Sequence, residues 1–227
     1  DQGFNYLSLM LNNKSDFILE HNEKNKENLR RGSIDWSQSR VLFIAPSFTP
    51  YQRGAISFKD LPIELWEVAI YENDLILFNQ LKSPEAKESI KTVTKGKTVA
   101  TVSNEIKEYT IEDHYKKSSP KTKELLDKLR EKILDIDENI KEKPVKYYIG
   151  YKLNWYNFVS IHVYKSKLKI HVRKNKLDKD KEKRFKKVSA SYRWGRTPLW
   201  WIDISKEEDL DYVSSVIKES YESAPDK

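Results

Sequence analysis

The sequence predicts a mixed α+β chain made of two modules. Its strand-like segments alternate apolar and polar side chains, as strands do in antiparallel sheets with one covered face. Helical segments come before and after a group of such strands, which is typical of helices that cover one side of a single sheet. A stretch rich in Ser, Thr, Lys and Glu separates the two halves. We therefore expect an α/β module at 1–82, a linker at 83–107 and a smaller α+β module at 108–227.

The N-terminal module is expected to begin with an amphipathic helix over residues 2–13. Its apolar residues recur at helical spacing, at Phe4, Leu7, Met10 and Leu11. Residues 16–28 are ambiguous, because Phe17-Ile18-Leu19 suits a strand whereas the polar run that follows favours a helix. The remaining elements expected are a strand at 40–45, a short helix at 51–58 and a hairpin of strands 63–71 and 74–81 around Glu72-Asn73-Asp74.

The C-terminal module is expected to contain two amphipathic helices around four strands. Ser119 is placed to cap a helix that has Pro120 at its first position. The buried stripe of this helix is expected at Leu125, Leu126, Leu129, Ile133 and Ile136. Strands are predicted at 145–153, 157–164, 167–173 and 199–204, with a basic loop or short helix at 174–187. A capping box at Ser205-Lys206-Glu207-Glu208 then starts the last helix, whose stripe is Leu210, Val213, Ile217 and Tyr221.

The strand at 167–173 carries the pattern that points to function. Its apolar residues Leu168, Ile170 and Val172 face one way, while its polar residues face the other, namely Lys167, Lys169, His171 and Arg173. The chain has a net charge of +7, and residues 145–201 hold 16 Lys or Arg against 3 Asp or Glu. Residues 1–82 hold 9 basic against 11 acidic residues. This asymmetry favours a polyanionic partner for the C-terminal module, the alternative being a Lys-rich surface that serves only solubility.

A set of cations and aromatic side chains forms the candidate nucleic-acid-binding surface. Cations neutralise phosphates, and aromatic rings stack on exposed bases. We expect Trp200 to lie in the core and Trp201 to be covered by a loop or to join the binding surface. The expected binding residues are Lys167, Lys169, Arg173, Lys174, Arg184, Lys186, Lys187, Tyr192, Arg193, Trp194 and Arg196.

Several function classes find no support in the composition. The absence of Cys excludes disulfide partners and thiol catalysis and suits a reducing cytoplasm. No apolar run approaches the roughly 20 residues needed to span a bilayer, so no membrane partner is expected. His162 and His171 are candidate neighbours across two strands, but two imidazoles without a carboxylate do not make a zinc site. We therefore expect no metal ligands and no cofactor in this chain.

Several segments resemble a known family. They are Gln2-Gly3-Phe4-Asn5-Tyr6-Leu7, Ile34-Asp35-Trp36-Ser37-Gln38-Ser39-Arg40-Val41-Leu42-Phe43-Ile44-Ala45-Pro46-Ser47-Phe48-Thr49, Leu61-Pro62-Ile63-Glu64-Leu65-Trp66-Glu67-Val68, Tyr109-Thr110-Ile111-Glu112-Asp113-His114, Lys146-Tyr147-Tyr148-Ile149-Gly150-Tyr151 and Glu208-Asp209-Leu210-Asp211-Tyr212-Val213. The resemblance is to bacterial and archaeal proteins in which a PD-(D/E)xK restriction-endonuclease-like domain is joined to an uncharacterised domain, often labelled "predicted transport protein".

The resemblance implies an incomplete nuclease-like half. In that family the Asp and the Glu-x-Lys that bind Mg²⁺ lie N-terminal to the segment matching Asp1, so this chain is expected to start just after them. Gln2 and Tyr6 are then the remnant of the site, where they would support the metal or touch the phosphate. The alternative is that Gln2 is a frayed terminal residue and that Tyr6 packs against the sheet. The Tyr192-Arg193-Trp194-Gly195-Arg196 segment departs from the His-Trp-Gly turn usual in the family.

The sequence thus favours a nucleic-acid-binding accessory portion of a nuclease-like defence or processing protein, with DNA preferred to RNA. The Glu-x-Lys triplets at Glu85 and Glu105 lie in the expected linker and not at a strand end, so no catalytic residue is assigned. One alternative is a protein-interaction module for an acidic partner. Another is an active Mg²⁺-dependent endonuclease, if an upstream Asp and Glu-x-Lys segment exists. The oligomeric state stays open.

Overall fold

The computed structural model describes residues 2–54, 56–58, 61–82, 102, 105–189 and 197–225. The chain divides into two compact units, residues 1–108 and 109–227, which we call the N-terminal and C-terminal units. Most of the stretch expected as a linker lies outside the described residues. Both units combine helices with a sheet, so the predicted α+β class is confirmed. No helix within the described ranges has the length and apolar character needed to cross a bilayer.

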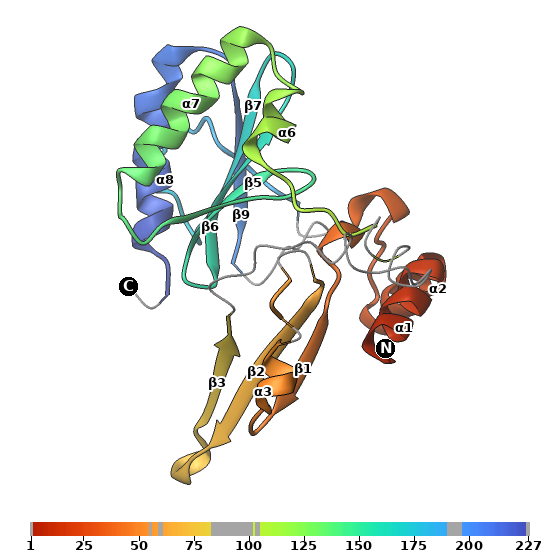
Figure 1. The fold of residues 1–227 in the computed structure, drawn as a ribbon. Coiled ribbons are helices and arrows are strands. Elements are labelled where there is room, and N and C mark those ends of the chain that lie inside the picture. The colour runs from red at the N-terminus through yellow and green to blue at the C-terminus, as the bar shows by residue number, and fades with distance from the viewer. Residues whose placement is uncertain are drawn as a thin grey trace. The chain divides into compact units, whose positions relative to one another are not determined.

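The N-terminal unit has two helices before a three-stranded sheet and a short helix between the first two strands of that sheet (Figure 1). The ambiguous segment is a helix, because the polar run Glu20–Asn25 continues the helical turns begun at Lys14. The short helix expected at 51–58 is confined to five residues. The described elements are α1 (Gln2–Asn12), α2 (Lys14–Asn25), η1 (Arg31–Ser33), η2 (Trp36–Gln38), β1 (Val41–Ala45), α3 (Pro50–Gly54), β2 (Ile63–Ile70), η3 (Glu72–Asp74) and β3 (Ile76–Leu81).

Strand order in this sheet is β1-β2-β3, with β1 parallel to β2 and β2 antiparallel to β3. The predicted hairpin is confirmed, and its closing pair is Ile70 opposite Ile76. Asn73 in the turn has φ 67, in the left-handed region that Asn tolerates better than most residues. At the other end of the unit, Gly3 of α1 approaches β1 so closely that an added Cβ would lie 3.1 Å from the Phe43 ring and 3.2 Å from Val41.

The C-terminal unit is a six-stranded antiparallel sheet of order β4-β5-β6-β7-β9-β8. Helices α7 and α8 lie side by side against one face of this sheet (Figure 1). The elements are α6 (Ile111–Tyr115), α7 (Pro120–Leu134), β4 (Lys141–Pro144), β5 (Ile149–Leu153), β6 (Tyr156–Val163), β7 (Leu168–Arg173), β8 (Lys186–Lys187), β9 (Leu199–Ile204), η4 (Glu207–Asp209) and α8 (Leu210–Glu222).

The helix α7 forms as its sequence predicts. Ser119 Oγ accepts a hydrogen bond from the Thr122 amide at 3.3 Å, and Pro120 occupies the first turn, where no intrahelical N–H partner is needed. The stripe that faces the sheet is buried at Leu125, Leu126, Leu129 and Ile133. On the sheet, Leu168, Ile170 and Val172 of β7 are fully buried, so the alternation predicted for this strand is confirmed.

Three expectations for this unit need correction. The strand expected at 145–153 begins only at Ile149, as β5. Residues 145–148 form the turn after β4, in which the Val145 amide donates to the Tyr148 carbonyl at 2.8 Å. The expected loop at 174–187 ends in the two-residue strand β8, which pairs with β9. The capping box at 205–208 is replaced by the turn η4, whose N-cap Lys206 makes no side-chain cap bond. Glu207 forms an ion pair with Lys128 of α7 at 2.7 Å.

Candidate functional site

The face of the C-terminal sheet that points away from α7 and α8 gathers cations around one tryptophan. In β7 the side chains that alternate with the buried ones lie on this face, and their cross-strand partners on β9 share it. Lys169 pairs with Asp203 and His171 with Trp201, while Trp201 in turn pairs with Lys186 of β8. We call the following residues the basic face: Lys169, His171, Arg173, Lys186, Trp201 and Asp203.

The indole ring of Trp201 lies within reach of two ammonium groups. Lys169 Nζ is 4.0 Å from the centroid of this ring and Lys186 Nζ is 5.2 Å from it. Both distances are within the roughly 6 Å over which a cation is attracted to the face of an aromatic ring. The ring is half-buried, so Trp201 is neither a core residue nor fully covered by a loop. The arrangement combines positive charge with a flat apolar surface at one point of the sheet.

An aspartate lowers the charge of this face. Lys167 Nζ forms an ion pair with Asp203 Oδ2 at 2.6 Å, and Lys169 Nζ lies 3.8 Å from Asp203 Oδ1. Asp203 lies just beyond the basic stretch 145–201 and so adds an acid that the charge of this stretch does not include. Its position opposite Lys169 depends on the register between β7 and β9, which local periodicity does not specify.

Two histidines meet on the same face. The rings of His162 and His171 are 4.8 Å apart at an interplanar angle of 66°, and Tyr148 lies 5.5 Å from His162. Burial lowers the pKa of His162 to about 3, with nearby His171 and Lys169 adding to the effect. Burial and then Lys169 lower the pKa of His171 to about 4. Both rings are therefore neutral near pH 7. In the described part of the chain, no three His, Asp or Glu side chains come together as a metal site.

Other predicted binding cations are held by acidic partners or lie on the opposite side. Lys174 Nζ pairs with the buried Glu219 of α8 at 2.6 Å. Arg184 pairs with Asp209 and lies 4.9 Å from the Tyr212 ring. Lys187 is opposite Trp200, whose indole N–H donates to the Lys174 carbonyl at 2.9 Å and which packs against the core as predicted. Tyr192, Arg193, Trp194 and Arg196 lie outside the described residues.

The candidate nuclease remnant is on α1. Gln2 Nε2 donates to Tyr6 OH at 3.0 Å, so the two residues do interact one helical turn apart. The Tyr6 side chain is 63% exposed, and the alternative that it packs against the sheet is wrong. Of the Glu-x-Lys candidates, Glu105 forms an ion pair with Lys14 at 2.8 Å, and Glu85 lies outside the described residues.

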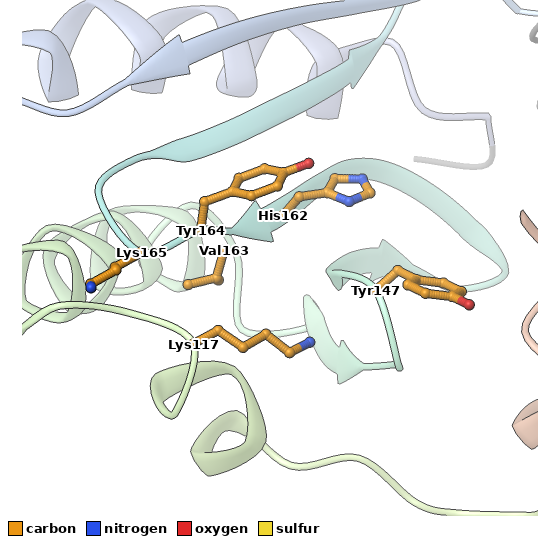
Figure 2. Close-up of a pocket in the computed structure, with 6 residues that line it drawn as sticks. All are labelled: Lys117, Tyr147, His162, Val163, Tyr164 and Lys165. Atoms are coloured by element: carbon orange, nitrogen blue, oxygen red, sulfur yellow. The ribbon is translucent and has the colours of Figure 1, made fainter. Parts of the chain in front are cut away.

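The structure also contains a shallow pocket of about 390 Å³ that sequence reasoning missed (Figure 2). It is formed where the α6–α7 connection, the β4–β5 turn and the β6–β7 turn meet. Its only sequence signal is the repeated placement of Tyr beside Lys at turns, in Lys146-Tyr147 and Tyr164-Lys165. The residues that line it are Lys117, Tyr147, His162, Val163, Tyr164 and Lys165.

Comparison with known proteins places the C-terminal unit in a family. Residues 111–224 match the family described as a domain of unknown function, DUF5655. The chain belongs to this family. It is also 38% identical over 222 residues to an uncharacterised protein of Haemophilus influenzae, and the alignment covers 97% of this chain and 73% of that protein. No solved structure matches the chain. The basic face and the pocket both lie within the DUF5655 region.

Proposed function

We propose that the DUF5655 unit binds nucleic acid through the basic face. The observation that supports this most is Trp201 with Lys169 and Lys186 beside its ring, at 4.0 and 5.2 Å from its centroid. Two ammonium groups attract phosphates and release their counterions, and an indole ring offers a stacking surface for any base. Recognition of this kind is weak and has little sequence preference, because no fixed hydrogen-bond donors are aimed at base edges.

The whole protein is then a nuclease-like factor in which this unit supplies contact with the substrate. The resemblance of the N-terminal segments to PD-(D/E)xK proteins supports this part of the proposal and favours DNA over RNA. The hydrogen bond between Gln2 and Tyr6 fits the remnant of a site that touches phosphate or supports Mg²⁺. Metal-dependent cleavage needs carboxylates that hold Mg²⁺ and a Lys near the attacking water. Among the described residues, no strand carries a Glu-x-Lys triplet.

The binding proposal is tested by fluorescence anisotropy with labelled single-stranded and duplex oligonucleotides at two salt concentrations. Lys169→Ala and Lys186→Ala should each reduce the salt dependence by about one ion. Lys218→Ala is the matched control, because this exposed lysine belongs to α8 on the opposite side of the sheet. Dissociation constants above roughly 10⁻⁴ M at low salt, weaker than ordinary non-specific binding, would overturn the proposal.

The aromatic part of the proposal has its own test. Trp201→Ala should weaken single-strand binding more than duplex binding, because only unpaired bases expose their faces for stacking, each worth roughly 1–3 kcal/mol. Trp201→Phe keeps a ring and should lose less. An acidic protein partner, the competing function, requires charge but no difference between single strands and duplex. Equal losses for both nucleic acids would therefore favour that alternative.

Tyr192, Arg193, Trp194 and Arg196 are predicted from the sequence alone to contact nucleic acid, and this prediction has its own test. Arg193→Ala combined with Arg196→Ala should flatten the salt dependence by about two ions. Trp194→Ala should affect single strands more than duplex. An unchanged salt dependence in the double variant would restrict the interface to the basic face.

The catalytic part is tested by incubating the purified 227-residue chain with plasmid and Mg²⁺ or Mn²⁺. We expect no cleavage, because neither Glu-x-Lys triplet lies on a described strand and the described residues contain no group of three acidic or histidine side chains that could hold a metal. Cleavage that survives further purification and stops with a chelator would contradict this and favour an active endonuclease.

A further inference from the structure

The pocket beside the basic face has the chemistry of an anion site with an aromatic wall. Two of its six lining residues are lysines, two are tyrosines and none is a carboxylate. His162 adds a ring that is uncharged near pH 7, because burial lowers its pKa to about 3. A second hollow on α7 offers a contrast, since it mixes Lys123 and Lys128 with Glu124, Asp127 and Glu131. Of these two hollows, only the first is lined by lysines without a carboxylate in the lining.

Lys117 is positioned by the fold. Its Nζ donates to the Lys146 carbonyl at 2.9 Å, which ties the α6–α7 connection to the β4–β5 turn. Figure 2 shows its ammonium directed toward Tyr147 and His162, whereas the Lys165 side chain points away from them. An ammonium carries three N–H donors and binds several acceptors at once. Lys117 is therefore suited to hold the oxygens of a phosphate, and Lys165 is suited to add long-range attraction at the rim.

The aromatic wall is formed mainly by Tyr164 in the β6–β7 turn. Its side chain is 45% exposed, and Lys167 Nζ lies 5.7 Å from the ring centroid. The turn is fixed from both sides, since the Tyr164 amide donates to the Lys167 carbonyl at 3.0 Å and the Ser119 amide donates to the Lys165 carbonyl at 2.9 Å. These hydrogen bonds fix the backbone that carries Tyr164, and its half-exposed phenol ring offers a flat surface to a base.

From this geometry we infer that the pocket binds a nucleoside monophosphate unit, with its phosphate at Lys117 and its base against Tyr164. The volume of about 390 Å³ lies in the range of roughly 300–1,000 Å³ usual for small-molecule sites. His162 joins the pocket to the basic face, because its ring packs against His171. The inference deepens the proposed function, on which it rests, by naming a strand end as the part of the nucleic acid that is recognised. A free nucleotide has the same chemistry.

Calorimetric titration of the full chain with adenosine 5′-monophosphate, adenosine and ribose 5-phosphate tests the two halves of the site. We expect the monophosphate to bind at least about tenfold more tightly than either other compound, because each of these lacks one half of the contacts. If ribose 5-phosphate binds as tightly as the monophosphate, the role of Tyr164 is overturned. If adenosine binds as tightly as the monophosphate, the role of Lys117 is overturned. No heat from any compound at millimolar concentration would overturn the site.

The variants assign the effect to this pocket. Lys117→Ala and Tyr164→Ala should each weaken binding of the monophosphate about tenfold, whereas Lys117→Arg and Tyr164→Phe should retain most of it. Lys218→Ala and Tyr71→Ala are the matched controls, and neither should change the affinity. If Lys117→Ala does not fold, the pair Tyr164→Ala and Tyr164→Phe still decides. Equal affinity for those two variants and the parent chain would contradict the inference.

Oligonucleotides with a 5′-phosphate or a 5′-hydroxyl separate the two sources of the ligand and the two proposals. A strand-end site predicts about tenfold tighter binding of the phosphorylated strand, and competition by the monophosphate removes this gain. If the monophosphate binds tightly but the 5′-phosphate does not increase the affinity of the oligonucleotide, the ligand is a free nucleotide. The oligonucleotide with a 5′-hydroxyl tests the basic face. Its affinity for the Lys117→Ala variant should equal its affinity for the parent chain. Failure of that strand to bind at all overturns the proposed function and leaves the monophosphate result as the test of the pocket.

Discussion

The two units differ in how completely their sheets are covered. In the C-terminal unit, α7 and α8 bury the inward side chains of one sheet face, and Leu129, Ile170 and Val213 are fully buried. In the N-terminal unit, Leu77 and Phe78 are neighbours on β3 that point to opposite faces, and each is 51% exposed. The buried cluster of that unit consists of Leu7, Leu11 and Val102. The C-terminal unit therefore has an extensive core, while the described part of the N-terminal unit combines a small buried cluster with exposed apolar side chains on its sheet.

This difference shows what each unit requires for stability. Burial contributes roughly 25 cal/mol for each Å² of apolar surface removed from water, so a sheet with both faces partly exposed receives little of it. Apolar faces of this extent are typical of surfaces that bind another protein or another segment. The exposed apolar residues of this sheet are Leu42, Phe43, Ile44, Ile70, Leu75, Ile76, Leu77 and Phe78.

The largest expected effect is on the isolated units. The isolated fragment 109–227 should keep the secondary structure that these residues have in the whole chain. It should unfold in one cooperative transition, because its core is internal to the unit. Residues 1–108 should show no cooperative transition on their own. Circular dichroism during thermal and urea unfolding checks both. A cooperative transition for 1–108 alone would show that its sheet needs no further cover.

A matched pair of substitutions measures the same contrast at one side chain. Leu129→Ala in α7 should lower the free energy of unfolding by about 2–5 kcal/mol, because it removes a buried side chain and leaves a cavity. Leu77→Ala in β3 should change it by less than about 0.5 kcal/mol, because the side chain is half exposed. Urea unfolding of the whole chain, followed separately for the two units, checks the pair. Similar losses at both positions would contradict the comparison.

The pH dependence should also separate the units. Burial lowers the pKa of His162 to about 3 and of His171 to about 4, against 6.5 for exposed histidine. Well above pH 6.5 neither state is protonated and this contribution to stability is complete, whereas as the pH falls through 6.5 the unfolded chain takes up protons that the folded unit does not. The C-terminal unit should lose on the order of 1–2 kcal/mol per histidine between pH 7 and pH 5. His171→Asn should reduce this slope, and urea unfolding of the C-terminal unit at pH 7 and pH 5 measures it.

The smallest effect is expected at two turns. Asn154 between β5 and β6 has φ 53, and Asn73 in the N-terminal hairpin has φ 67. Asn154→Ala should lower the stability of the C-terminal unit by about 1 kcal/mol, because Ala tolerates the left-handed region poorly, and Asn154→Gly should be nearly neutral. Asn73→Ala should leave the unfolding of the C-terminal unit unchanged. An effect of Asn73→Ala on that transition would show that the two units unfold together.

Local patterns in the sequence determined most of the elements. The stripe from Leu125 to Ile133 predicts α7, the pair Ser119 and Pro120 predicts its start, and the alternation in β7 predicts which of its faces is buried. These predictions succeed because helical and strand periodicity act on neighbours within a few residues. The sequence did not predict β4 and β8, because these strands hold only four and two residues and form only by pairing with β5 and β9.

Tertiary structure decided how the candidate site is composed. The sequence predicted basic residues on one face of the sheet, but the register between β7 and β9 places Asp203 beside Lys169 and Trp201 beside Lys186. Lys174 and Arg184 look equivalent to Lys169 in the sequence, yet acidic residues of α8 and η4 hold them. The pocket unites Lys117, Tyr147 and Tyr164 from three separate connections. Contacts between such distant segments arise only when the sheet pairs and the helices pack, so no local pattern encodes them.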